Sequence, residues 1–152
     1  MEKYALLLGY FDKQLVFIHK IYAEIDAVDI SSYHERSTFA LKIQQFYTAL
    51  EGLFKQISKA FENHIENMSQ FHKEILPRMS LDIPKIRPAV LSSQSCVFLN
   101  KIRSFRHFIW HAYDCELAEE QLALIQQKLK GEYSLVEKDL QKFRAYIKKL
   151  SE

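Results

Sequence analysis

The sequence predicts an all-α protein, an antiparallel bundle of four to six helices, and two observations carry this prediction. The first is that only three glycines and three prolines occur among the 152 residues. A sandwich or barrel of short strands needs turn residues about every 8 to 12 positions, which so few breakers cannot supply. The second is that apolar residues recur at alternating steps of three and four, the period of an amphipathic helix. A doubly wound α/β fold is disfavoured because no glycine-rich strand-to-helix turn is present.

Length and composition indicate one domain over residues 1–152. The chain is 48% hydrophobic and carries 11 Phe, 8 Tyr and 1 Trp, enough apolar mass for a single core. Its two cysteines, Cys96 and Cys115, are too few for a disulfide framework. No signal peptide is apparent, and no stretch approaches the roughly 18 apolar residues of a membrane span. We therefore expect a cytoplasmic protein with no membrane partner.

The first half of the chain contains three predicted helices. Apolar residues spaced by three and four share one face over residues 3–27, which predicts the first helix. Ser32 and Glu35 then fit a capping box, in which each side chain satisfies the other's free backbone N–H. A second long stripe covers residues 39–61, and a short helix follows around residues 68–75. All three prolines, Pro77, Pro84 and Pro88, come next, and they predict one long irregular connection over residues 77–91.

Three further helices are predicted after this connection. One of the serines at 92–93 caps the first of them. Asp114 caps the next, which is expected to end before Gly131. Ser134 with Glu137 forms a second capping box and opens the final helix. The inward stripe of the first of these helices is formed by Phe98, Ile102, Phe105, Ile109 and Ala112.

The charge distribution singles out residues 83–113, which include no acidic residue. Such a segment can attract a polyanion such as nucleic acid. It can equally be a solvated face balanced by the acidic segment that follows it. The basic residues of the segment are Lys85, Arg87, Lys101, Arg103 and Arg106, together with His107 and His111.

One stretch within this segment, KIRSFRHFIWHAYD at 101–114, has the residues for chemistry. At 100° per residue Arg106 and Tyr113 share a helix face if the helix runs on, whereas His111 lies about 140° from Arg106. One isolated helix therefore cannot form a tight site, but two copies that face one another can. An arginine can hold a phosphate and a histidine can transfer a proton, a sufficient set for metal-free cleavage of RNA. The alternative is an ordinary polar helix face.

Two other interpretations of the same stretch remain open. Trp110 either stacks on a base or packs in an interface. His107, His111 and Cys115 have the i, i+4, i+8 spacing of a metal-binding face, but no fourth ligand is evident. We therefore expect neither a metal nor a cofactor. Glu51, an acid on an apolar-rich helix, can pair with a basic residue of such a site.

The run Arg106-x4-His111-x-Tyr113 resembles the R-x4-H-x-Y signature of the HEPN superfamily, in its HepT-like toxin branch. The flanking text, FHKEILPRMSLDIPKIRPAVLS at 71–92 and FRHFIWHAYD at 105–114, is similar to the loop and motif of HepT-like proteins. The resemblance extends from the second predicted helix through Asp114.

This resemblance implies a HEPN-like homodimer and a metal-independent endoribonuclease, with transfer RNA as the expected substrate. Such toxins are paired with a minimal nucleotidyltransferase (MNT) antitoxin, which transfers AMP to the motif tyrosine. Carried over to this sequence, Arg106 and His111 are catalytic and Tyr113 is the AMP acceptor. The auxiliary or RNA-binding residues are His107, Arg103 and Trp110, and the loop residues Arg78, Lys85 and Arg87 either touch RNA phosphates or are solvated.

The alternative function is a non-catalytic HEPN subunit that presents substrate or nucleotide to a separate nucleotidyltransferase. The presence of Arg106, His111 and Tyr113 together favours the toxin, because a degenerate scaffold has less reason to keep all three.

Overall fold

The computed structural model describes residues 2–62, 68–111 and 118–152, with side chains at all of these except 68–72 and 110–111. The described residues form five helices and no strand. These are α1 (Glu2–Ala27), α2 (Tyr33–Glu62), α3 (Met68–Met79), α4 (Ser93–His111) and α5 (Glu119–Ser151). The prediction of an all-α bundle is therefore confirmed. None of these helices offers an apolar stretch long enough to cross a lipid bilayer.

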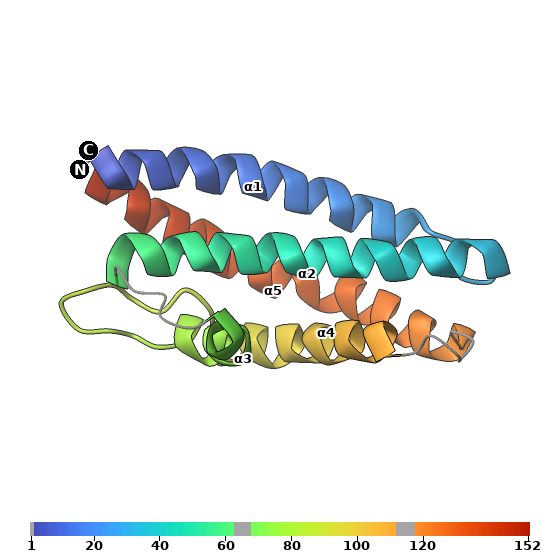
Figure 1. Cartoon of the computed structure of the whole chain (residues 1–152). Helices are drawn as coiled ribbons and strands as arrows, with labels where there is room; N and C mark the ends of the chain where they lie inside the picture. Colours follow the sequence, from blue (N-terminus) through green and yellow to red (C-terminus); the bar gives the residue numbers. More distant parts are fainter. Residues whose placement is uncertain (1, 63–67, 112–117) are drawn as a thin grey trace.

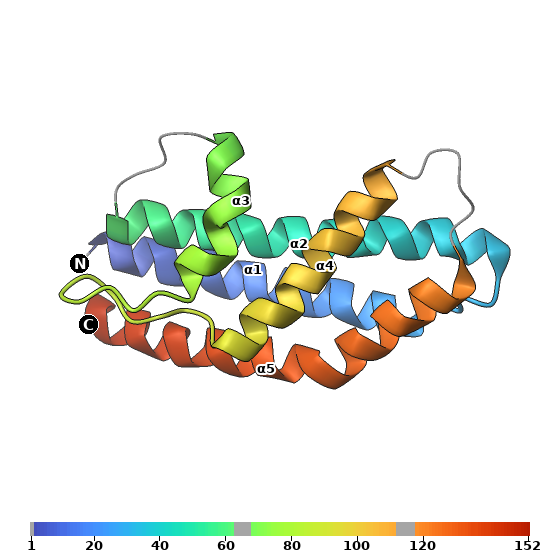
Figure 2. The ribbon, with the colours of Figure 1, turned by 90° about the horizontal axis from the view of Figure 1, so that it is seen from below.

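The three long helices α1, α2 and α5 run side by side, and the shorter α3 and α4 lie on the side away from α1 (Figure 1). α1 runs antiparallel to both α2 and α5, which are parallel to one another, and both chain ends lie at the same end of the bundle. Figure 2 shows α4 crossing α2 and α5 obliquely. The face of α2 that α1 leaves uncovered is thus covered by α3 and α4.

One core holds these helices together. Burying a large apolar side chain contributes about 1.5–3 kcal/mol, and this term opposes the entropy lost on folding. The most completely buried side chains come from α1, α2, α4 and α5. They include Phe11, Ile18, Phe39, Phe46, Tyr47, Phe54, Phe98, Ile102, Leu140 and Phe143.

The N-terminus of α4 is fixed by a serine cap, as the sequence predicts. The backbone N–H of Ser95 donates to Ser92 Oγ at 3.2 Å. The N–H and hydroxyl of Ser92 both donate to Asp139 Oδ2 on α5, each at 2.8 Å. The cap therefore satisfies one free helical N–H and also ties the start of α4 to α5.

Two predicted boundaries are wrong. The irregular connection does not begin at Pro77, because α3 continues to Met79. A proline in the last turn removes one helical N–H, and the turn persists since Ser80 donates to the carbonyls of Leu76 and Pro77.

The predicted break at Gly131 is also wrong, because α5 runs unbroken from Glu119 to Ser151. Ser134 and Glu137 are therefore interior residues, not a capping box. A glycine inside a helix costs about 1 kcal/mol, and the buried apolar stripe that continues across it outweighs this cost. That stripe comprises Leu122, Leu129, Tyr133, Val136, Leu140, Phe143 and Ile147. The predicted cap Asp114 lies outside the described residues; the residue before α5 is Ala118, with φ −71° and ψ 129°.

The connection between α3 and α4 contains a tight turn at residues 83–87. Ile86 N–H donates to the Ile83 carbonyl at 3.0 Å, and Ile83 N–H donates to the Arg87 carbonyl at 2.9 Å. Pro84 occupies the second turn position and Lys85 the third, with φ +68°. Proline followed by a residue at positive φ is the pattern of a type II turn, whose third position favours glycine.

Lys85→Gly is expected to raise the free energy of unfolding by about 0.5–1 kcal/mol. A side chain in the left-handed region costs about 1–2 kcal/mol, and glycine avoids this cost while adding some unfolded-state entropy. Urea denaturation measures the change. Ala89→Gly in the same connection changes a residue whose φ is not positive, so it should be destabilising instead. Equal effects of the two substitutions would contradict this account of the turn.

Candidate active site

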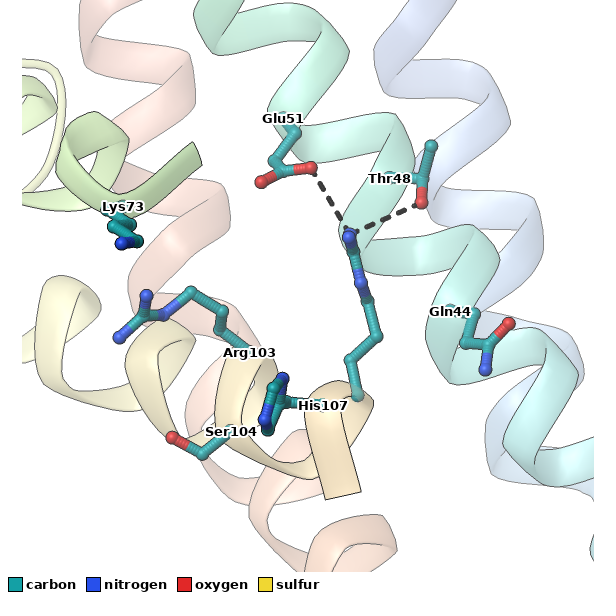
Figure 3. Close-up of a pocket in the computed structure, with 8 residues that line it drawn as sticks. Gln44, Thr48, Glu51, Lys73, Arg103, Ser104 and His107 are labelled. Carbon is teal, nitrogen blue, oxygen red and sulfur yellow. Dashed lines mark hydrogen bonds and ion pairs between the residues drawn. The ribbon is translucent and has the colours of Figure 1, made fainter. Parts of the chain in front are cut away.

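A pocket of about 660 Å³ lies between α2, α3 and α4 (Figure 3). The pocket is lined by Gln44, Thr48 and Glu51 of α2, Lys73 of α3, and Arg103, Ser104, Arg106 and His107 of α4. Three of the predicted site residues, Arg103, Arg106 and His107, are thus brought together.

Arg106 is held against α2 by three contacts. Its Nη1 donates to Glu51 Oε1 at 3.2 Å and to Thr48 Oγ1 at 3.5 Å. The guanidinium also lies over the ring of Tyr47, 5.1 Å from the ring centroid, in cation–π geometry. Arg106 thus has a defined orientation, although a third of its side chain is exposed (33%).

Helical spacing explains why these residues meet. Phe105 and Ile102 bury the inner stripe of α4, so Arg106 lies at the edge of that interface. On α2, Tyr47 and Glu51 are four residues apart and therefore lie one above the other on a single face. Glu51 could be suspected from its position in an apolar helix, but only the packing of α4 on α2 identifies Arg106 as its partner.

Tyr47 supports this arrangement without taking part in proton transfer at neutral pH. Its side chain is fully buried. Burial raises the pKa of its hydroxyl far above the ordinary value, and the negative charge of Glu51 raises it further. The ring therefore presents a neutral face to the Arg106 guanidinium.

Arg103 and His107 complete the α4 side of the pocket. Arg103 Nε and Nη2 donate to Asn100 Oδ1 at 3.1 and 2.7 Å, which fixes the guanidinium one turn toward the start of α4. His107 is exposed. Lys73 reaches the same pocket from α3, and no feature of the sequence distinguished it from other lysines.

Other basic residues of the 83–113 segment are not in this pocket. Arg87 is wholly buried, and its Nη2 donates to Glu62 Oε1 at 3.1 Å. The interpretation of Arg87 as a loop residue that touches RNA is therefore wrong. Lys85 lies in the tight turn, and Lys101 lines a separate groove with Lys128 of α5. The side-chain hydrogen bond with Lys128, and then the positive charge of Lys128, lower the pKa of Lys101.

The remaining predicted residues are only partly described. His111 is the last residue of α4, and the side chains of Trp110 and His111 lie outside the described ones. Tyr113 and Cys115 also lie outside the described residues, so the proposed metal-binding face that includes Cys115 is not covered. Within the described part of the chain, no three His, Cys, Asp or Glu side chains cluster as metal ligands.

The charge balance of the pocket favours an anionic ligand. Among the described residues, three cationic side chains, Lys73, Arg103 and Arg106, face it together with one carboxylate, that of Glu51. Arginine presents a planar fork of donors that matches a phosphate group. The pocket can therefore bind a phosphate-bearing molecule and stabilise negative charge that develops on it.

Comparison with known proteins agrees with the sequence motif. The family model described as "HepT-like protein" matches residues 38–147, which include all eight pocket residues. Searches of curated proteins and of solved structures give no significant match.

Proposed function

Since this chain belongs to the family of HepT-like proteins, we propose that it is the toxin of a toxin–antitoxin pair and cleaves RNA without a metal ion. Arg106 and His111 are its catalytic residues, and transfer RNA is its expected substrate. The observation that supports this most directly is the orientation of Arg106 in a pocket with excess positive charge.

Arg106 is suited to bind the phosphate that is cleaved. Within the described residues its polar contacts use Nη1 alone, so Nη2 and Nε remain for a phosphate oxygen. The ion pair with Glu51 holds the guanidinium in place before substrate arrives. Preorganised donors stabilise a transition state without reorganising during the reaction.

His111 is proposed to transfer the protons of the reaction. The ribose 2′-hydroxyl loses its proton as its oxygen attacks phosphorus. The bond from phosphorus to the 5′-oxygen then breaks, and that oxygen gains a proton. An imidazole that titrates near neutral pH serves as the base for the first transfer, as the acid for the second, or as both.

The helical angle between Arg106 and His111 supports a homodimer in which two copies of α4 form one cleft. A separation of about 140° around the helix makes a joint action within one copy difficult.

We propose Tyr113 as the AMP acceptor for an MNT-type nucleotidyltransferase antitoxin. AMP on Tyr113, two residues after His111 in the sequence, would add bulk and negative charge to this motif and so exclude an RNA phosphate.

The test is cleavage of total tRNA in EDTA by purified protein whose mass shows no nucleotide adduct. Wild type and a His34→Ala control, which changes an exposed histidine at the start of α2, should both cleave. His111→Ala should cleave tRNA about 10²- to 10⁴-fold more slowly than wild type, because a general acid or base usually contributes a rate factor of this size.

Two outcomes would contradict the proposal. Equal cleavage by wild type and His111→Ala would point to a contaminating nuclease or a different site. No cleavage by any folded variant, together with a stable complex with a nucleotidyltransferase, would identify the chain as a non-catalytic subunit of that enzyme.

A further inference from the structure

Besides Arg106, the pocket contains two further basic side chains, Lys73 of α3 and Arg103 of α4. We propose that Lys73 and Arg103 form a subsite for a second backbone phosphate of single-stranded RNA, adjacent to the phosphate at Arg106. This inference rests on the proposed function and names residues that position the substrate.

The first support is the placement of the two side chains. Both line the same pocket, although they come from different helices. In Figure 3 they lie on the side toward α3, whereas Glu51, the carboxylate to which Arg106 donates, lies on α2. The pocket therefore has two polar regions, each with its own cationic group.

The second support is the difference in charge between these regions. The positive charge of Arg106 is balanced by the carboxylate of Glu51, which is 7% exposed. Arg103 is held by Asn100, a neutral amide that orients the guanidinium, and no carboxylate of the described residues is paired with it. Lys73 makes no ion pair within the described residues. The net attraction for an anion therefore comes from Lys73 and Arg103, since an ion pair close to neutral attracts a distant phosphate weakly.

The third support is spacing and room. Arg103 and Arg106 are three residues apart, so their Cβ atoms are separated by about 5–6 Å on the same helix. Their guanidinium groups then diverge, one toward Asn100 and one toward Glu51. A volume of about 660 Å³ exceeds what one phosphate needs. The geometry thus suits two phosphates of one strand better than one phosphate shared by both arginines.

Binding of a 5′-labelled 2′-O-methyl oligoribonucleotide, followed by fluorescence anisotropy over a range of salt concentrations, tests this subsite. The ligand lacks the attacking hydroxyl, so binding is measured whether or not the protein cleaves RNA. Lys73→Ala and Arg103→Ala should each weaken binding about three- to tenfold and make the log–log salt dependence shallower by about 0.7. Lys73→Arg should restore both values.

Lys138→Ala is the matched control, because it removes one exposed lysine from α5, which does not line the pocket. It should leave the salt dependence unchanged. With a cleavable RNA, Lys73→Ala should raise KM and leave kcat nearly unchanged, the mark of a group that binds substrate and transition state alike.

Two results would overturn the subsite, and they are distinguishable. If wild type binds and cleaves RNA but Lys73→Ala and Lys138→Ala have the same salt dependence, the subsite is wrong and the proposed function stands. If wild type does not bind the oligonucleotide at all, the subsite and the ribonuclease proposal fail together.

Discussion

Arg106→Ala is expected to reduce RNA cleavage by about 10²- to 10³-fold, the cost of removing one preorganised donor at a developing charge. The orientation of Arg106 over Tyr47 and against Glu51 is the physical basis of this loss. Single-turnover cleavage of tRNA measures the effect on the chemical step. Expression without the antitoxin should also become harmless to growth.

The same substitution leaves Glu51 as a largely buried carboxylate without its guanidinium. We expect it to lower the free energy of unfolding by about 1.5–3 kcal/mol, the usual contribution of a hydrogen bond to a charged group. The double variant Arg106→Ala/Glu51→Gln should recover much of this stability and none of the activity. Cleavage that returns together with stability would show that Arg106 acts only on the fold.

Arg144→Ala is a close control for Arg106→Ala. The two arginine side chains are similarly exposed, 31% and 33%, and each pairs with one carboxylate, Arg144 with Asp12. Arg144 is on α5 and does not line the pocket. Its removal should leave cleavage within about twofold of wild type, because a surface ion pair contributes only about 0–1 kcal/mol.

Arg87→Ala is expected to lower the free energy of unfolding by about 3–5 kcal/mol, as when one partner of a buried ion pair is removed. The side chain of Arg87 is 0% exposed and that of Glu62 is 7% exposed. Arg87 donates to Glu62 and to three carbonyls, those of Arg78, Leu81 and Pro88. All four acceptors would lose this donor. Urea denaturation followed by circular dichroism measures the change.

Arg78→Ala separates this effect from simple loss of charge. Arg78 Nε donates to the same Glu62 Oε1 at 3.2 Å, but its side chain is 32% exposed. Its removal should lower the free energy of unfolding by about 1 kcal/mol or less. A similar cost for both substitutions would show that Arg87 does not hold the connection between α3 and α4 in place.

Local sequence signals predicted the parts of the fold that depend on neighbouring residues. The three-and-four spacing located α1 and α2, and the serine cap located the start of α4. The break at Gly131 was wrong because glycine and a capping pattern are local signals, whereas the continuity of α5 depends on a stripe buried by other helices. Tertiary burial of that stripe outweighs the weak preference of one residue.

The residues of the candidate site also fall into two groups, those brought together by helical spacing and those brought together by packing. Arg103, Arg106 and His107 share one helix, and their proximity follows from spacing. Lys73 is 30 residues before Arg103 in the sequence, and Glu51 is 55 residues before Arg106. These two residues join the site only through the packing of three helices. Arg87 shows the converse, because a basic residue in a proline-rich connection is usually solvated, and here it is a buried structural group.

The position of α1 has a practical consequence for all of these measurements. Within the described part of the chain, this helix packs on α2 and α5 only and contributes no pocket residue. Both chain ends lie at one end of the bundle. The exposed face of α1, which includes Leu6 and Val16, is accessible for a fluorophore or a surface tether. A dye attached there reports on tumbling and on association between copies while the pocket between α2, α3 and α4 stays untouched.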